Sequence, residues 1–288
     1  ELGPDSPGES FEDSAKPRVS VILPTFNRRN LAHRALSSVL RQTEQDFELF
    51  FIDDGSTDGT KNPEGLSPKI RYLRQENKGV AAARNLGIRN ARGKWLAFLD
   101  SDDEWLPGKL EKQLLFHDKN PQFWISQTQE IWVRRGVRVN SMKKHAKKSG
   151  EIFEASLPLC LISPSCTLIR SDLLQETGLF DESFQVCEDY ELWLRITARF
   201  PVGLVDEALT VKYGGHEDQL SKRYWGMDAF RIRAIVKTMK ESPLTKAQKA
   251  SCIAELRKKC RIYAADCLKR GRKEEAEEYL SLAKINGH

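Results

Sequence analysis

Three aspartates stand within four residues of one another at Asp100, Asp102 and Asp103, directly after the apolar run 95–99 (WLAFL). Carboxylates this close repel one another, and burial would raise the pKa of each. Mg²⁺ or Mn²⁺ relieves both effects, because these cations take oxygen ligands and commonly share them with the phosphates of a substrate. The alternative is a solvated acidic turn in front of a helix, which we predict over residues 105–118.

The elements that must position these carboxylates alternate along the first third of the chain. A run that is apolar at every position is typical of a central strand covered by helices on both faces. Similar runs at residues 19–23, 47–52 and 70–73 alternate with helical patterns, which predicts a parallel, doubly wound sheet with ligands at its carboxyl edge. Polar residues follow each strand at that edge: Thr25 and Asn27, Asp53 and Asp54, Glu76 and Asn77, and the three aspartates.

The second half of the chain is less regular. Its pattern predicts strands over residues 123–133, 166–169, 202–205 and 208–213, and a helix over 190–200. After residue 221 the pattern becomes strongly helical. The segment 260–284 resembles one helical hairpin of the tetratricopeptide kind, and a single such unit needs neighbours to bury its faces. We therefore expect a helical extension packed on the main domain, with a contact between two copies of the chain as a further prediction.

Composition limits the class of protein. The chain has 288 residues, 40% hydrophobic and 30% charged, which suits one large α/β domain with a helical appendage. No stretch approaches the ~18 apolar residues of a membrane-spanning helix. No GxGxxG follows the first strand and no GxxxxGK[ST] occurs, which disfavours dinucleotide oxidoreductases and P-loop NTPases. Six cysteines without metal-ligand spacing predict buried thiols in a reducing compartment, the cytoplasm.

The net charge of +5 is unevenly distributed. Residues 1–15 hold five acids and no base, and we interpret them as a disordered leader. The segment 134–148 has seven Lys or Arg and no acid, and residues 222–288 carry 17 Lys or Arg against 8 acids. These basic segments are either solvated surface or a contact for an anionic acceptor or for phospholipid headgroups at the inner face of the plasma membrane.

Four motifs together resemble family 2 glycosyltransferases. They are VSVILPTFNRR (19–29), FELFFIDDGSTDGT (47–60), ENKGVAAARNLGIRNARGKWLAFLDSDDEW (76–105) and CEDYELWLR (187–195). The resemblance covers residues 18–221 and implies a GT-A fold, in which a mostly parallel, Rossmann-like sheet lies between helices. It also implies a nucleotide-diphosphate sugar donor, a divalent metal and inversion at the anomeric carbon. On this basis we predict a leader (1–17), a glycosyltransferase domain with a nucleotide-sugar half (18–104) and an acceptor half (105–221), and a helical extension (222–288).

The resemblance also assigns the donor site. In it, Phe26 is placed to stack on a flat base, with core packing as the alternative. Asp54 matches the residue that accepts from the N3–H of uracil, a donor that cytosine lacks, which favours a UDP-sugar. Arg84 would reach the phosphates and Asp100 the ribose hydroxyls. The nucleotide-sugar residues are thus predicted to be Pro24, Thr25, Phe26, Asn27, Arg28, Asp53, Asp54, Asn77, Arg84, Asp100 and Ser101.

For the chemistry, the resemblance implies that Asp102 holds Mn²⁺ or Mg²⁺. His216 matches a histidine beside the metal or diphosphate, with a purely structural role as the alternative. Asp189 matches the catalytic base, and the alternative is an acid that favours the dipole of the helix it begins. We predict an acceptor site at Glu188, Trp193 and Asp103. The alternative for Trp193 is core packing. The alternative for Asp103 is support of the metal site.

The resulting functional hypothesis is transfer of a single sugar to a hydroxyl of a glycan or glycolipid, in the synthesis of bacterial cell-surface polysaccharide. The chain lacks the QxxRW-type motif of processive relatives. The alternatives are a polyprenyl-phosphate glycosyltransferase and a catalytically inactive sugar-nucleotide binding module. A nucleotidyltransferase is disfavoured, because no Gly-rich loop follows the first strand. We expect no nucleic-acid partner.

Overall fold

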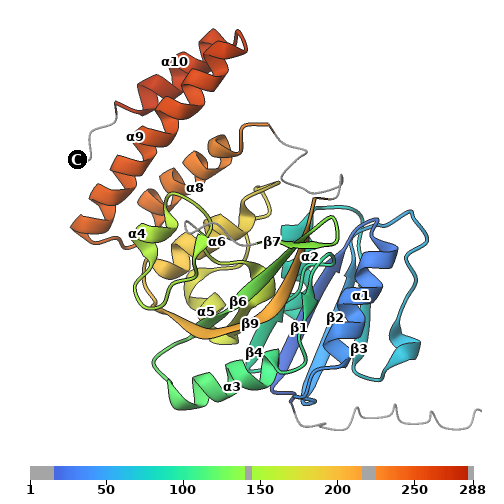
Figure 1. The fold of residues 1–288 in the computed structure, drawn as a ribbon. Helices are drawn as coiled ribbons and strands as arrows, with labels where there is room; N and C mark the ends of the chain where they lie inside the picture. The colour runs from blue at the N-terminus through green and yellow to red at the C-terminus, as the bar shows by residue number, and fades with distance from the viewer. Residues whose placement is uncertain (1–15, 140–144, 216–224, 285–288) are drawn as a thin grey trace, which may run out of the picture.

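The computed structural model describes residues 16–139, 145–215 and 225–284, which fold around one mixed sheet (Figure 1). The strands lie in the order β3-β2-β1-β4-β8-β6-β9-β5, and β7 pairs with β6. Their bounds are β1 (Val19–Thr25), β2 (Phe47–Asp53), β3 (Ile70–Arg74), β4 (Trp95–Phe98), β5 (Glu104–Trp105), β6 (Ile125–Arg134), β7 (Val137–Val139), β8 (Thr167–Arg170) and β9 (Val202–Gly214).

The first four strands confirm the predicted parallel arrangement. β1 pairs with β2 on one side and with β4 on the other, and β3 extends the sheet beyond β2. The chain therefore winds outward from β1 to β3 and then returns to place β4 on the opposite side of β1. Ligands of open α/β sheets bind in the crevice at such a reversal, outside the carboxyl ends of the strands. Thr25, the last residue of β1, and Asp100, which follows β4, flank this crevice.

Helices cover both faces of the sheet, as strand alternation requires. On β1, Val21 and Leu23 pack against α1 (Arg29–Leu40) and α3 (Lys109–Lys119). Ile22 points to the other face, which is covered by α2 (Val80–Asn90), α5 (Ser171–Thr177) and α6 (Glu188–Thr197). The two apolar clusters hold the strand ends at fixed positions.

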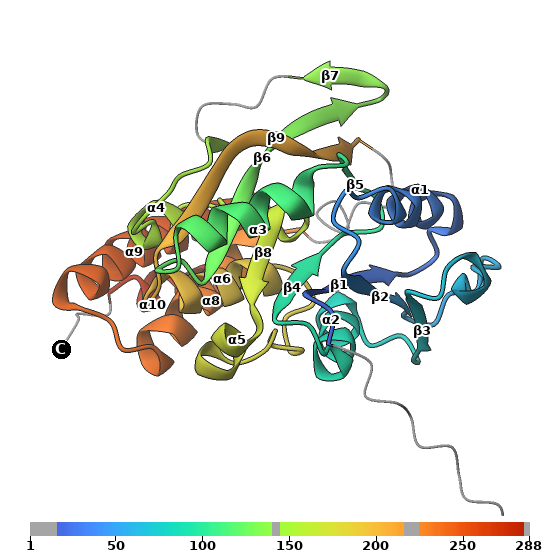
Figure 2. The same ribbon diagram turned by 90° about the horizontal axis from the view of Figure 1, so that it is seen from below.

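The predicted helical extension follows β9. It consists of α8 (Met227–Glu241), α9 (Lys246–Lys269) and α10 (Lys273–Leu282), which pack with α6 and with α4 (Phe153–Ser156) around a third apolar cluster. Figures 1 and 2 both place these helices at the opposite end of the molecule from β3. The predicted hairpin is confirmed, and Gly271 makes its turn with a positive φ of 74°. Two short 3₁₀ helices, η1 (Glu64–Leu66) and η3 (Pro164–Cys166), complete the fold.

Three predicted elements need correction. The helix predicted over 105–118 begins only at Lys109, because Trp105 belongs to β5 and pairs with Thr210 of β9. The strands predicted over 202–205 and 208–213 form the single 13-residue strand β9. Irregular pairing opposite Gln129 accommodates the polar stretch between them. The helix predicted over 190–200 begins two residues earlier, at Glu188. The predicted boundaries at residues 17, 104 and 221 stay predictions.

All six cysteines are free, and five of them are buried, as predicted. Within the described part of the chain, none of the helices combines the length and apolar character needed to cross a membrane.

Candidate active site

The loops after β1 and β2 are fastened to each other. Asn27 has a positive φ of 51°, and its side-chain oxygen accepts a hydrogen bond from the Thr57 N–H at 2.7 Å. The Asn27 N–H donates to Ser56 Oγ at 2.9 Å, and the carbonyl of Thr25 accepts from the Asp54 N–H at 2.9 Å. The two loops therefore form one rigid rim at the carboxyl edge.

Asp53 and Asp54 hold this rim to the next strand. The fully buried carboxylate of Asp53 accepts from the Ser56 N–H at 2.8 Å and the Tyr72 hydroxyl at 3.0 Å, and it pairs with Arg74. Asp54 accepts from the backbone N–H groups of residues 78 and 79, both at 2.9 Å, and from the side chains of residues 75 and 77. Both carboxylates thus already accept hydrogen bonds from the chain itself. To bind Asp54, a uracil N3–H would have to add a further hydrogen bond to this carboxylate or replace one of the present ones.

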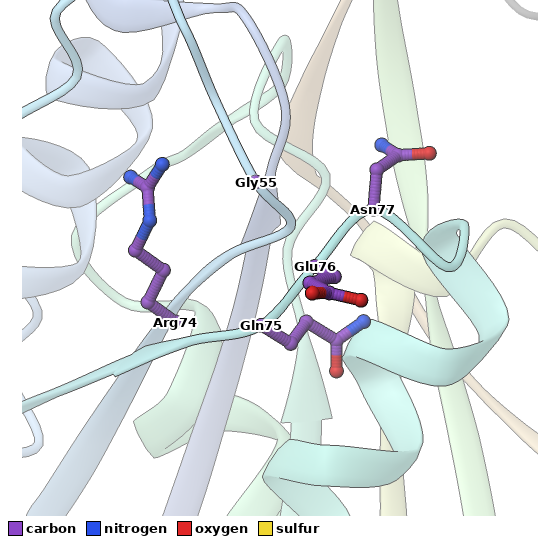
Figure 3. Close-up of a pocket in the computed structure, with 5 residues that line it drawn as sticks. All are labelled: Gly55, Arg74, Gln75, Glu76 and Asn77. Atoms are coloured by element: carbon purple, nitrogen blue, oxygen red, sulfur yellow. The ribbon is translucent and has the colours of Figure 1, made fainter.

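An open hollow of about 530 Å³ lies at the carboxyl ends of β2 and β3, lined by Gly55, Arg74, Gln75, Glu76 and Asn77. Figure 3 shows Arg74 and Asn77 on either side of Gly55. Gly55 has a φ of 81°, and a Cβ there would lie 2.8 Å from the Asn77 nitrogen. The position therefore needs glycine, both for its backbone conformation and for the close approach of the two loops.

Pairing of β1 with β4 brings the loop after β1 beside the acidic motif. Arg28 pairs with Asp102 at 3.0 Å, and the two side chains are 17% and 16% exposed. Phe26 is half-buried in the same loop. The hydroxyl of Thr25 is buried and has no hydrogen-bond partner among the described residues.

The carboxylates at this edge of the sheet suit a divalent metal that takes most of its ligands from the substrate. No group of three or more His, Cys, Asp or Glu in the described ranges is arranged to hold a metal ion. Mg²⁺ and Mn²⁺ do not need such a cage, because one or two carboxylates together with substrate phosphates suffice. Asp102, whose side chain is 16% exposed beside Arg28, is a carboxylate that such a metal can reach. His216, the second predicted metal residue, lies outside the described residues.

Arg84 joins the two halves of the site. Its guanidinium donates to Asp100 Oδ1 and to Glu188 Oε1, both at 2.7 Å, and its side chain is 4% exposed. Burial alone would lower the pKa of Arg84, but the two carboxylates outweigh burial and raise it above its ordinary value. Arg84 was predicted to reach the donor phosphates. In this structure it instead connects the loop after β4 to the first residue of α6.

Glu188 and Asp189 begin α6, as the sequence predicts. The residue before them, Cys187, has a positive φ of 61°, which turns the chain sharply into the helix. Asp189 is half-buried, and one of its oxygens accepts a hydrogen bond from the Cys160 thiol at 3.6 Å. Burial, and then the Asp189 carboxylate itself, raise the pKa of Cys160 well above its usual range. The Cys160 thiol therefore keeps its proton, which it can donate to the Ile162 carbonyl at 3.1 Å or to Asp189.

Asp103 supports the site from behind. It is 2% exposed, accepts from Ser165 Oγ at 2.6 Å and lies 3.7 Å from Lys212 Nζ. Burial raises the pKa of Asp103 to about 7, although Lys212 acts against the increase. This placement favours the supporting role over the predicted acceptor contact.

Trp193 does not line a surface. It is 1% exposed and packs edge-on against Phe180, with ring centroids 6.3 Å apart, which is the core-packing alternative. The predicted acceptor contact of Trp193 is therefore wrong, because its ring is buried. Pro24 and Ser101 are also buried.

Sequence reasoning missed the cations around the acidic motif. Lys212 lies behind Asp103, and Arg34 donates to the Asp102 carbonyl at 2.7 Å. Neither has a local signal, because a single lysine in a strand and a single arginine in a helix are typical of solvated faces. Arg84 was singled out, but its partner Glu188, 104 positions away, could not be inferred from spacing.

The structure is thus an α/β fold with an acidic motif directly after β4. Residues 20–178 match the model of glycosyl transferase family 2. The chain belongs to glycosyl transferase family 2. The matched segment ends before Glu188 and Asp189.

Among curated relatives, an uncharacterized glycosyltransferase of Rickettsia felis is 39% identical over 196 residues, which are 67% of this chain and 32% of that protein. The chain thus spans about a third of that relative's length. WfgD of Escherichia coli is 35% identical over 182 residues, covering 62% of this chain and 69% of its own. WfgD is described as a UDP-Glc:α-D-GlcNAc-diphosphoundecaprenol β-1,3-glucosyltransferase.

Two solved structures share the fold. Residues 1–349 of Staphylococcus aureus TarS in complex with UDP-GlcNAc align with a TM-score of 0.62 at 16% identity, covering 92% of this chain and 90% of that chain. The mannosyltransferase PcManGT of Pyrobaculum calidifontis, in complex with GDP-Man and Mn²⁺, aligns with a TM-score of 0.62 at 17% identity, covering 96% and 77%. These similarities show a GT-A glycosyltransferase fold.

The pKa of Glu188 gives a pH-dependent prediction. Burial, and then Asp189, raise this pKa from an ordinary value of 4.5 to about 7, against the effect of Arg84. Between these values the folded protein holds a proton that the unfolded chain releases, so stability falls as pH rises. Glu188→Gln removes this dependence. The difference in Tm between the variant and the unmodified protein should therefore increase by a few degrees from pH 5 to pH 8. In a protein of this size, a change of about 1 kcal/mol in the free energy of unfolding moves Tm by about 2–4 °C. A flat or falling difference in thermal melts would contradict the assignment.

Proposed function

We propose that this protein transfers a single sugar from a UDP-sugar to a hydroxyl of a glycan or glycolipid acceptor, with inversion, during synthesis of a bacterial cell-surface glycan. The observation that carries the proposal is the Arg84 bridge. It brings the residue after β4, on the donor side, into one charged cluster with the Glu188–Asp189 pair on the acceptor side. A sugar transferred between two substrates needs this arrangement of two adjoining subsites.

On the donor side, the hollow beside Gly55 and the crevice beside Thr25 would receive the nucleotide. Phe26 would offer a stacking surface for the base, and Asp54 would favour uracil through its N3–H. The relative WfgD is described as using UDP-Glc, and the TarS structure holds UDP-GlcNAc, which supports a uridine donor. Asp100 would bind the ribose hydroxyls.

Asp102 would hold the divalent metal together with the donor diphosphate. When bound, the metal would neutralise the negative charge that the diphosphate gains as it leaves. Arg28, 3.0 Å from Asp102, keeps a positive charge at the same place. The Mn²⁺ in the PcManGT structure supports a divalent metal in this fold.

Asp189 would act as the catalytic base. An inverting transfer needs one group to take the acceptor hydroxyl proton while that oxygen attacks the anomeric carbon from the face opposite the diphosphate. The Tyr190 N–H donates to one Asp189 oxygen at 2.7 Å, which orients the carboxylate, and the Cys160 thiol lies 3.6 Å from the other oxygen. Glu188 stays paired with Arg84 and would shape the acceptor side. Contact between two copies of the chain stays a prediction.

The donor assignment predicts that, with Mn²⁺ present, UDP binds more tightly than CDP or GDP in calorimetry. Phe26→Ala should weaken UDP binding by roughly 5- to 100-fold, because stacking on a base contributes about 1–3 kcal/mol. Leu115→Ala, which removes an apolar side chain 49% exposed on α3, is the matched control and should bind UDP normally. Tighter binding of GDP than of UDP would overturn the uridine assignment.

The metal assignment predicts that Asp102→Ala abolishes release of UDP from UDP-sugars in Mn²⁺ while the thermal melt stays close to that of the unmodified protein. Asp102 is partly exposed, so its loss removes no core packing. Asp206→Ala, a change at an exposed acid of β9, serves as the control and should stay active. Full activity of Asp102→Ala, or of the unmodified protein in excess EDTA, would refute metal dependence through this residue.

The base assignment predicts that Asp189→Asn separates binding from chemistry. The asparagine is nearly isosteric but cannot accept the proton, so kcat should fall by roughly 10²- to 10⁴-fold while UDP affinity stays within a few-fold. Asp172→Asn is the control and should keep its kcat, because Asp172 is a carboxylate 48% exposed in the first turn of a different helix, α5. If Asp189→Asn lost UDP binding and kept its kcat, Asp189 would belong to the donor site.

A further inference from the structure

The β6–β7 hairpin projects from the sheet with a cationic and partly apolar tip (Figure 2). Its two-residue turn is Arg135-Gly136, and both residues have positive φ, at 48° and 77°. Such turns match the twist of the flanking strands. The tip is thus a built hairpin with paired strands, and its side chains have fixed faces.

The tip carries three exposed arginines, Arg134, Arg135 and Arg138, and no acid occurs among residues 131–139. No ion pair to any of the three is found within the described ranges. The preceding acid, Glu130, is turned inward and pairs with the buried Lys147 at 3.1 Å. The positive charge of the hairpin is therefore not neutralised by its own strand.

Apolar side chains accompany this charge. Val137 is 65% exposed at the tip, which is unfavourable in water. Pairing sets Val137 opposite Arg134 and Val139 opposite Trp132, so these four side chains share one face of the hairpin. Aromatic and aliphatic groups beside arginines are the composition that enters the headgroup region of a bilayer.

The hairpin adjoins the candidate active site. β6 runs beside β9, and the register sets Trp132 opposite Lys212, whose ammonium lies 3.7 Å from Asp103 in the acidic motif. A surface bound by the hairpin would therefore lie near the acidic motif.

We propose that residues 132–139 dock this protein on an anionic phospholipid surface. The arginines bind lipid phosphates, and Val137 inserts among the headgroups. The inference goes beyond the proposed function, and its test measures binding without activity.

The test is co-sedimentation of the whole protein with vesicles of phosphatidylcholine alone or mixed with phosphatidylglycerol. The unmodified protein should bind only the mixed vesicles, and less at high salt. Replacing the three arginines by alanine should weaken binding by about 100-fold, because each basic residue near such a surface contributes a factor of several. Val137→Ser should weaken it by severalfold, with unchanged thermal melts for both variants.

The matched control replaces Lys240, Lys246 and Lys249, three exposed cations of α8 and α9, by alanine. It should bind the mixed vesicles nearly as well as the unmodified protein. The proposal is overturned if this control loses as much binding as the arginine variant, if the arginine variant binds normally, or if the unmodified protein ignores phosphatidylglycerol. A hairpin required for binding a DNA oligonucleotide but not vesicles would also overturn it.

Discussion

The placement of the site depends on one buried guanidinium. Arg84 holds Asp100 and Glu188 at once, and the side chains of Arg84 and Glu188 are only 4% and 7% exposed, so water screens this pair poorly. Removing one partner of a buried ion pair typically costs about 3–5 kcal/mol, because the remaining charge stays buried and unpaired. The next residue, Asn85, exchanges two hydrogen bonds with the backbone of Phe180. One turn of α2 thus fixes the donor-side loop and the segment that leads to α6.

The helical extension holds that same segment from the other side. Lys237 of α8 pairs with Asp181 at 2.7 Å and with Glu191 at 3.0 Å, and Arg233 donates to the Ser183 carbonyl at 3.2 Å. In α9, Lys259 donates to the Pro158 carbonyl at 2.8 Å, in the loop that carries Cys160. The two stretches flanking Asp189 are therefore anchored by helices outside the family match, so α8 and α9 are part of the architecture of the site.

The sequence predicted what local pattern determines. β1, β2 and β4 are mostly apolar runs followed by turn-forming residues, so both the parallel sheet and its polar edge could be inferred from spacing. Long-range contacts could not. Trp105 looks like the start of a helix until β9, more than a hundred residues later, pairs with it. Lys212 has the surroundings of a solvated strand, yet its side chain is only 19% exposed and lies 3.7 Å from Asp103. Trp193 has helical spacing that suits a pocket wall or a core equally, and only packing decides between them.

The three aspartates of the acidic motif differ in burial, and therefore in what each can do. The Asp103 side chain is 3% exposed, that of Asp102 16% and that of Asp100 24%. A carboxylate as buried as Asp103, already bonded to Ser165, cannot exchange partners without a large desolvation change, so it fixes the loop. Asp102 pairs with Arg28 at the edge of solvent, where one ionic partner can be replaced by another at little cost. Asp100 is itself partly exposed, although its partner Arg84 is buried. The motif therefore combines one structural carboxylate with two that a charged ligand can reach. For this reason three aspartates are tolerated within four residues.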